Sequence, residues 1–142
     1  MAIGSAQRSH TMRDPFTVGE RVELVASSLR DVGLSAEHIL PIPDLDQYHL
    51  WVAQVQAYVP QFDLIVSANP MTANLFEAAG VRVLRMEAQD RERLSGTEVR
   101  RRLIAGISVT DLVAPSVAAF LDRPEVHARF EALRKAREGH HG

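Results

Sequence analysis

One segment of the sequence combines hydroxyl groups, a glycine and an arginine at a spacing that suits phosphate binding. Ser95, Gly96 and Thr97 stand at the expected start of a helix, and Arg100 follows one turn later. Free backbone N–H groups and the positive end of the helix dipole attract an anion there, and an arginine can add a bidentate contact. The same stretch has the Ser-x-x-Glu spacing of an ordinary capping box, completed by Glu98. Phosphate binding and simple helix capping both remain open from these residues.

A second candidate is Trp51, the only tryptophan, on an expected helix that follows an acidic loop containing Asp44. Its ring could stack on a nucleobase or on the pyridinium of a nicotinamide nucleotide, where cation–π attraction is worth about 1–2 kcal/mol in a desolvated site. Core packing is the alternative for a lone tryptophan on an amphipathic helix. For Asp44 the alternative is a turn or cap residue.

A third candidate is the polar loop that holds Ser5, His10 and Arg13, directly after a short strand segment. Open α/β sheets bind their ligands beyond the carboxyl ends of the strands. A plain surface loop would have the same composition, so this segment alone decides nothing.

Composition limits the remaining functions. A chain of 142 residues with 46% hydrophobic residues suits one domain, and a net charge of -2 gives no basic field for a nucleic-acid partner. The absence of cysteine excludes disulfides and thiolate zinc sites, and the scattered histidines predict no metal site. No segment predicts a signal sequence or a membrane span, so we expect a cytoplasmic protein.

Strand and helix patterns alternate along the chain and predict an α/β fold. Continuous apolar runs favour a parallel sheet covered on both faces, and the end of the chain is expected to be helical. Thr17 with Glu20 predicts a capping box for the first helix, as Ser95 with Glu98 does for a later one. We expect strands at residues 1–3, 38–42, 62–67 and 81–84, helices near residues 17–33, 48–59 and 70–79, and a frayed tail at 137–142 that includes His140 and His141.

Four segments, taken in order, match a known pattern. They are GSAQ, SHT, RDPFT and GER within residues 4–21; residues 41–44 with LWV at 50–52; Pro60, FD at 62–63 and SANP at 67–70; and SGTEVRR at 95–101. Together they resemble the archaeal-type nicotinamide-nucleotide (NMN) adenylyltransferase family of the H-x-G-H nucleotidyltransferase superfamily. The resemblance covers nearly the whole chain.

The resemblance implies a Rossmann-like, doubly wound nucleotidyltransferase fold and the reaction of ATP with NMN to give NAD and pyrophosphate, with Mg²⁺ arriving with ATP. It also implies a homo-oligomer, with a hexamer as one candidate. By the resemblance, Ser95, Gly96 and Thr97 hold the triphosphate while Arg13 and Arg100 act as the catalytic cationic clamps. The residues it places at NMN or NAD are Ser5, Asp44, Tyr48, Trp51 and Asn69.

The sequence also departs from the family pattern. The early element with the H-x-G-H histidines is not present, so the chain matches a domain without its first βα unit of roughly thirty residues. In a sheet of order 3-2-1-4-5 the first strand is central, so we expect the remaining strands to fall into two separate pairs. A start codon assigned too late, or a broken gene, would explain this pattern. Tyr48 stands where the family often has asparagine, and Ala68 replaces the glycine of S-G-N-P.

These observations lead us to expect an NMN adenylyltransferase. Two alternatives remain open at this stage. One is a non-catalytic nucleotide-binding remnant of the family, and the other is a sister nucleotidyltransferase that acts on a different phosphate ester, such as phosphopantetheine or FMN.

Overall fold

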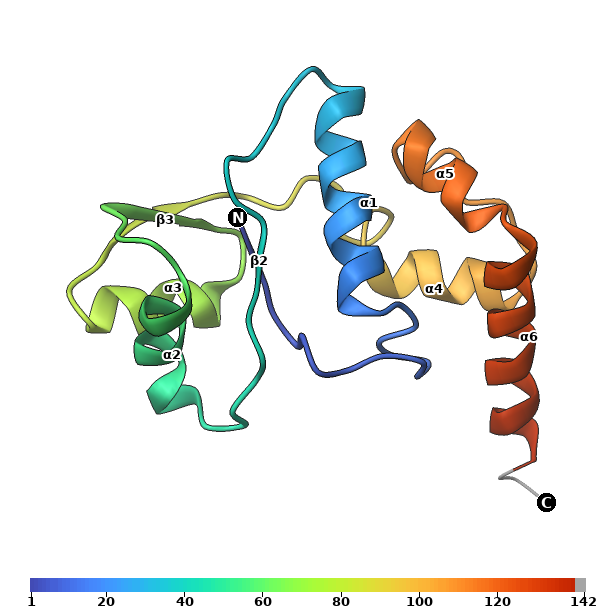
Figure 1. Ribbon diagram of the computed structural model, residues 1–142, viewed down its shortest axis with the longest axis horizontal. Helices are drawn as coiled ribbons and strands as arrows, with labels where there is room; N and C mark the ends of the chain where they lie inside the picture. The colour runs from blue at the N-terminus through green and yellow to red at the C-terminus, as the bar shows by residue number, and fades with distance from the viewer. Residues whose placement is uncertain (140–142) are drawn as a thin grey trace.

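The computed structural model describes residues 1–139 and consists of short parallel strands with helices around them (Figure 1). β3, α2 and α3 gather at one end, α1, α4, α5 and α6 at the other, and β1 and β2 run between them. The elements in chain order are β1 (Ala2–Ile3), α1 (Val18–Asp31), β2 (Leu40–Pro41), the 3-10 helix η1 (Tyr48–Leu50), α2 (Trp51–Tyr58), β3 (Leu64–Ser67), α3 (Pro70–Ala78), β4 (Arg82–Arg85), α4 (Gly96–Ile104), α5 (Pro115–Leu121) and α6 (Pro124–Glu138).

The strands form two separate parallel pairs. β1 pairs with β2, with Ala2 opposite Leu40, and β3 pairs with β4, with Leu64 opposite Arg82. Within residues 1–139 no strand joins the two pairs. The α/β class and the parallel strand direction are as predicted from the sequence, and so is the separation into two pairs.

Two apolar cores stabilise the two ends of the molecule. Ile42 and Phe76 belong to one core, built from β2, α2 and α3 and flanked by side chains of β3 and β4. Phe120 and Phe130 belong to the other, where the ring of Phe16 packs edge-on against both at 5.6 and 5.9 Å. The two cores share no buried residue. The segments that connect them therefore decide how the two ends are held together.

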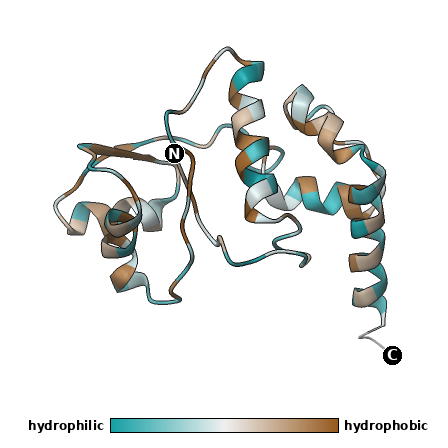
Figure 2. Ribbon diagram, viewed as in Figure 1, coloured by the Kyte–Doolittle hydropathy of each residue, from teal (hydrophilic) through white to brown (hydrophobic). Residues whose placement is uncertain are grey.

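One face of the β3·β4 pair is uncovered, contrary to the expectation of a sheet covered on both faces. Alternation along β3 directs Ile65 into the core and leaves Val66 55% exposed, with Leu64 and Leu84 exposed beside it. Figure 2 shows β3 as a strongly hydrophobic ribbon. A groove of about 640 Å³ lies between β1 and β3 and is lined by residues of both strands. The prediction was wrong because no element of the described chain packs on this face.

The two predicted capping boxes have different outcomes. At α1, the Thr17 hydroxyl accepts from the Glu20 N–H and the Glu20 carboxylate accepts from the Thr17 N–H, as predicted. At α4, the Ser95 hydroxyl accepts from the Glu98 N–H at 3.1 Å, but the Glu98 carboxylate pairs with arginines in the same helix. The second box is therefore only half formed.

The end of the chain is more regular than expected over part of its length. Arg137 and Glu138 still belong to α6, so the expectation of a frayed tail at 137–142 is wrong for these two residues. His140 and His141 lie outside the described residues. In residues 1–139, no helix combines the length and the hydrophobicity that crossing a membrane requires.

Candidate nucleotide-binding cleft

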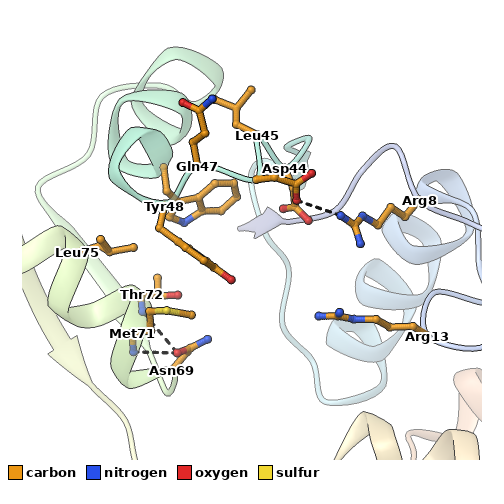
Figure 3. A pocket seen from close by; sticks show the side chains of 12 residues that line it. Arg8, Arg13, Asp44, Leu45, Gln47, Tyr48, Asn69, Met71, Thr72 and Leu75 are labelled. Carbon is orange, nitrogen blue, oxygen red and sulfur yellow. Dashed lines mark hydrogen bonds and ion pairs between the residues drawn. The ribbon is translucent and has the colours of Figure 1, made fainter.

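A cleft of about 390 Å³ opens beyond the carboxyl ends of β1, β2 and β3. Parallel strands place ligand-binding loops at this edge, because all their carboxyl ends point the same way. Figure 3 shows Arg8 and Arg13 reaching in from the loop after β1, and Tyr48, Met71 and Asn69 facing them from the other side. Its lining residues are Arg8, Arg13, Asp44, Leu45, Asp46, Gln47, Tyr48, Trp51, Asn69, Met71, Thr72 and Leu75.

The loops after β1 and β2 are joined side by side by hydrogen bonds. The Ser5 N–H and hydroxyl donate to the two carboxylate oxygens of Asp44, at 3.1 and 2.5 Å. The side chain of Gln7 donates to the Asp44 carbonyl and accepts from the Asp44 N–H. The Ala6 N–H donates to the Ile42 carbonyl and so adds a backbone hydrogen bond between the same two segments. The orientation of the Asp44 carboxylate is thus fixed by Ser5, a residue that the sequence analysis also placed at this site.

Two arginines bring positive charge to the cleft, and they differ in their partners. Arg8 forms an ion pair with Asp46 at 3.1 Å. Within residues 1–139, the Arg13 guanidinium has no hydrogen-bond or ion-pair partner, and it points into the cleft (Figure 3). An exposed, unpaired guanidinium can bind a phosphate bidentately without first breaking another ion pair.

Aromatic side chains form the wall that faces the arginines. Trp51 is half-buried and packs against the apolar core around Phe76, and it also lines the cleft. The expected core packing is therefore present, and stacking on a nucleotide stays a prediction. Tyr48 is 67% exposed and directs its hydroxyl across the cleft (Figure 3).

Asn69 caps α3 and borders the cleft at the same time. Its side-chain oxygen accepts from the N–H groups of Met71 and Thr72, at 3.0 and 3.5 Å. This leaves the amide nitrogen directed into the cleft (Figure 3). The side chain can therefore donate a hydrogen bond to a ligand while it keeps its structural role.

The segment at residues 95–100 does not line this cleft. Ser95 is the N-cap of α4, and Gly96 and Thr97 form its first turn. Arg100 curls back over this turn, donating to the Thr97 hydroxyl at 3.2 Å, with its Nη1 3.0 Å from the place that a Cβ on Gly96 would occupy. Arg101 and Arg102 lower the pKa of Glu98 to about 2 by hydrogen bonding to its carboxylate. The structure therefore brings Arg13, Asp44, Tyr48, Trp51 and Asn69 together and leaves the α4 residues apart from them.

Arg8, Met71 and Thr72 line the cleft although the sequence analysis did not single them out. Arg8 lies in the same polar loop as Ser5 and Arg13, so its place in the sequence could have predicted that it lines the cleft. Met71 and Thr72 are in the first turn of a helix that follows a strand, which is a weaker signal.

Residues 1–102 match the cytidylyltransferase-like family model, which is well over half of the chain. The chain belongs to the cytidylyltransferase-like family. The resemblance stated from the sequence is confirmed by curated relatives that are nicotinamide-nucleotide adenylyltransferases, three of which follow. This cytidylyltransferase-like chain is 40% identical over 124 residues to the enzyme of Pyrococcus furiosus, covering 85% of this chain and 66% of that relative. The enzyme of Picrophilus torridus is 36% identical over 138 residues, which cover 97% of this chain and 82% of that relative. The enzyme of Methanosarcina barkeri is 44% identical over 117 residues, which cover 82% of this chain and 67% of that relative.

Solved structures agree on the fold of this cytidylyltransferase-like chain. It superposes with a TM-score of 0.70 on a bifunctional NMN adenylyltransferase/ADP ribose pyrophosphatase from Francisella tularensis, at 16% identity. The match covers 96% of this chain and 44% of that protein. A second structure, of the complex of such an enzyme with AMP and a manganese ion, gives a TM-score of 0.67 at 17% identity. At these identities the likeness establishes the fold alone.

Proposed function

We propose that the protein transfers the adenylyl group of ATP to NMN, forming NAD and pyrophosphate. The observation that carries this proposal is the cleft, which gathers Arg13, Asp44, Tyr48, Trp51 and Asn69 from separate segments. The resemblance implied a clamp or nucleotide-binding role for each of them. Curated relatives at 36–44% identity bear the name of this activity.

The reaction is an in-line displacement at phosphorus. A phosphate oxygen of NMN attacks the α-phosphorus of ATP. The bond between that phosphorus and the oxygen that bridges the α- and β-phosphates breaks, so that pyrophosphate leaves. A protein accelerates such a step by aligning two anions and by neutralising the developing charge. In the proposed arrangement the unpaired guanidinium of Arg13 supplies that positive charge in the cleft, and no covalent intermediate with the protein is needed.

NMN binds, in this proposal, with its nicotinamide ring against Trp51. The pyridinium carries a positive charge, and a partly desolvated indole face attracts it. Asp44 adds negative charge nearby, held in place by Ser5. Asn69 and Tyr48 provide hydrogen-bonding groups at the rim of the cleft. This set favours a pyridinium over a neutral base of similar size.

The ATP triphosphate is assigned to the start of α4, with Ser95, Gly96, Thr97 and Arg100. For the anion to reach this turn, Arg100 has to release the Thr97 hydroxyl and swing outward. In residues 1–139 no cluster of three or more His, Asp or Glu residues could hold a metal ion by itself. In this proposal Mg²⁺ arrives with ATP, bound to its phosphates.

The competing function is binding of a pyridine nucleotide without adenylyl transfer. The lining of the cleft favours it in one respect, because its described residues include arginines but no histidine, the residue type of the family's H-x-G-H element. Both functions require the Trp51 pocket, and only the first requires turnover.

The experiment is a titration of Trp51 fluorescence with NMN, followed by chromatographic detection of NAD after incubation with ATP, Mg²⁺ and NMN. Saturable quenching by NMN but not by CMP, together with NAD formation, supports adenylyl transfer. Quenching without any NAD selects the binding function. A flat titration contradicts both. Light scattering of the same sample measures the homo-oligomer that belongs to the proposal.

A further inference from the structure

Arg21, in the first turn of α1, hydrogen-bonds to three carbonyl groups of a single loop. Its Nη1 donates to the Gly4 carbonyl at 2.9 Å, and its Nη2 donates to the Ser5 and Arg8 carbonyls at 2.8 and 3.2 Å. The side chain is half-buried, and its Nε is buried without a hydrogen-bond partner in the described residues. The loop carbonyls therefore hold the guanidinium, and the guanidinium in turn holds the loop.

The loop needs such support because its backbone is strained. Ser5 has φ of 52°, in the left-handed region that residues other than glycine rarely adopt. A conformation of this kind persists only where the surrounding structure imposes it. The carbonyls on either side of this strained position, those of Gly4 and Ser5, are the ones that the two terminal nitrogens of Arg21 bind most closely.

The same loop supplies one side of the cleft. From the strained position the Ser5 N–H and hydroxyl reach the Asp44 carboxylate, and Arg8 reaches Asp46. The loop is thus held on one side by the segment after β2 and on the other by Arg21. Arg21 does not itself line the cleft. Any effect that it has on a ligand acts through the loop.

We propose that Arg21 is the positioning residue of the cleft, which holds the loop at residues 4–8 so that the Ser5–Asp44 pair and Arg8 are preset for the acceptor nucleotide. This inference rests on the proposed function for the identity of the ligand. Its structural part, the control of the loop by Arg21, is measurable without any ligand.

The test compares Arg21→Met, Arg21→Lys and a matched control, Arg102→Met. Arg102 is also a half-buried arginine with several partners, namely Glu98, Asp111 and the Ser108 carbonyl, but it lies away from the cleft. Two quantities are measured on each variant. The first is hydrogen exchange at the amides of Ser5, Ala6 and Arg8, which donate to Asp44, Ile42 and Ser5. The second is the dissociation constant for NMN from Trp51 fluorescence.

Arg21→Met is expected to lose protection at these three amides but not in β3, and to bind NMN about ten- to a hundredfold more weakly, the scale of effect of small misplacements in a site. Arg21→Lys is expected to retain part of the amide protection and part of the NMN affinity. One ammonium group carries the charge but cannot span the three carbonyls as a planar guanidinium does. Arg102→Met leaves both quantities as in the wild type.

Unchanged protection of the loop in Arg21→Met overturns the inference, whatever NMN does. Loss of protection with an unchanged dissociation constant for NMN also overturns it, because the loop would then not control the cleft. If the wild-type chain does not bind NMN, the proposed function fails, and the hydrogen-exchange comparison still decides whether Arg21 holds the loop.

Discussion

The ion pair between Glu20 and Arg129 joins α1 to α6 and offers a quantitative test of how the molecule is held together. Arg129 donates from both terminal nitrogens to the two carboxylate oxygens, at 2.7 and 2.9 Å, and also to the Pro15 carbonyl. The same carboxylate accepts from the Thr17 N–H in the capping box. Both side chains are mostly buried, with 23% of Glu20 and 16% of Arg129 exposed.

Replacing Glu20 with Gln keeps the shape and removes the charge. One oxygen acceptor is lost and an NH₂ group is turned toward the Arg129 guanidinium, so the expected loss of unfolding free energy is about 2 kcal/mol, the scale of a hydrogen bond to a charged group. For a chain of this size that corresponds to a fall in Tm of about 4–8 °C. The matched control is Glu77→Gln. It breaks the Glu77–Arg85 pair, whose side chains are 46% and 47% exposed, and is expected to lower the stability clearly less than Glu20→Gln, because solvent screens an exposed pair.

The pH dependence of the stability difference between wild type and Glu20→Gln is a second, independent test of this ion pair. The hydrogen bonds from Arg129 lower the pKa of Glu20 below its ordinary value of 4.5. A carboxyl whose pKa is lowered by folding stabilises the fold fully above its unfolded pKa, and the effect disappears as the pH falls through the folded pKa. The difference between wild type and Glu20→Gln is therefore full at pH 7 and shrinks below about pH 4.5, as measured by urea unfolding at several pH values. A difference below about 0.5 kcal/mol at pH 7, or one that does not change with pH, would refute the reasoning.

Three further predictions concern the charges and the open face. Arg13→Met should weaken NMN binding about tenfold by calorimetry, because its exposed guanidinium has no ion-pair partner among residues 1–139 and is available to an anion, and an unchanged affinity would remove it from the site. An NMR titration should find the Glu98 carboxyl with a pKa of about 2, since two arginines hydrogen-bond to it, and an ordinary value would contradict that geometry. Val66→Lys should lower self-association in sedimentation velocity at high protein concentration, because a charge on an uncovered apolar face opposes its burial against a second copy; equal association would place the contact elsewhere.

The comparison of the two capping boxes shows what could be predicted about the fold. Both have the same Ser/Thr-x-x-Glu spacing, which is a local signal that the sequence carries in full. At Glu20 nothing within the helix competes for the carboxylate, and its partner Arg129 binds it without displacing the Thr17 N–H. At Glu98 the arginines three and four residues later lie on the same helix face and capture the carboxylate. The spacing predicted both helix starts correctly and failed only where neighbouring charges competed.

The candidate site was predictable where residue types carry chemistry by themselves. Residue type and position made Trp51, Asp44 and Arg13 candidates with a structural alternative each, the family resemblance implied their roles, and the structure places them in one cleft. Arg21 could not be found in this way, because its partners are carbonyl groups 13 to 17 residues earlier, and a carbonyl has no signature in the sequence. Contacts of side chains with the backbone of distant loops depend on the fold and follow from no local pattern.

The position of the cleft explains why the positioning contacts matter to any ligand. Arg13 lies three residues before Phe16, which packs against the core that contains Phe120, whereas Trp51 packs against the core that contains Ile42 and Phe76. The two cores share no buried residue, and α1 contacts both β1 and β2, so the hydrogen bonds of the loop at residues 4–8 add to the contacts that set the geometry between the arginine and the aromatic wall. A ligand that contacts both sides gains full binding energy only if this loop is already ordered, since ordering it on binding costs conformational entropy. The contacts of Arg21 and Asp44 with this loop therefore favour tight binding of a ligand that reaches both sides of the cleft.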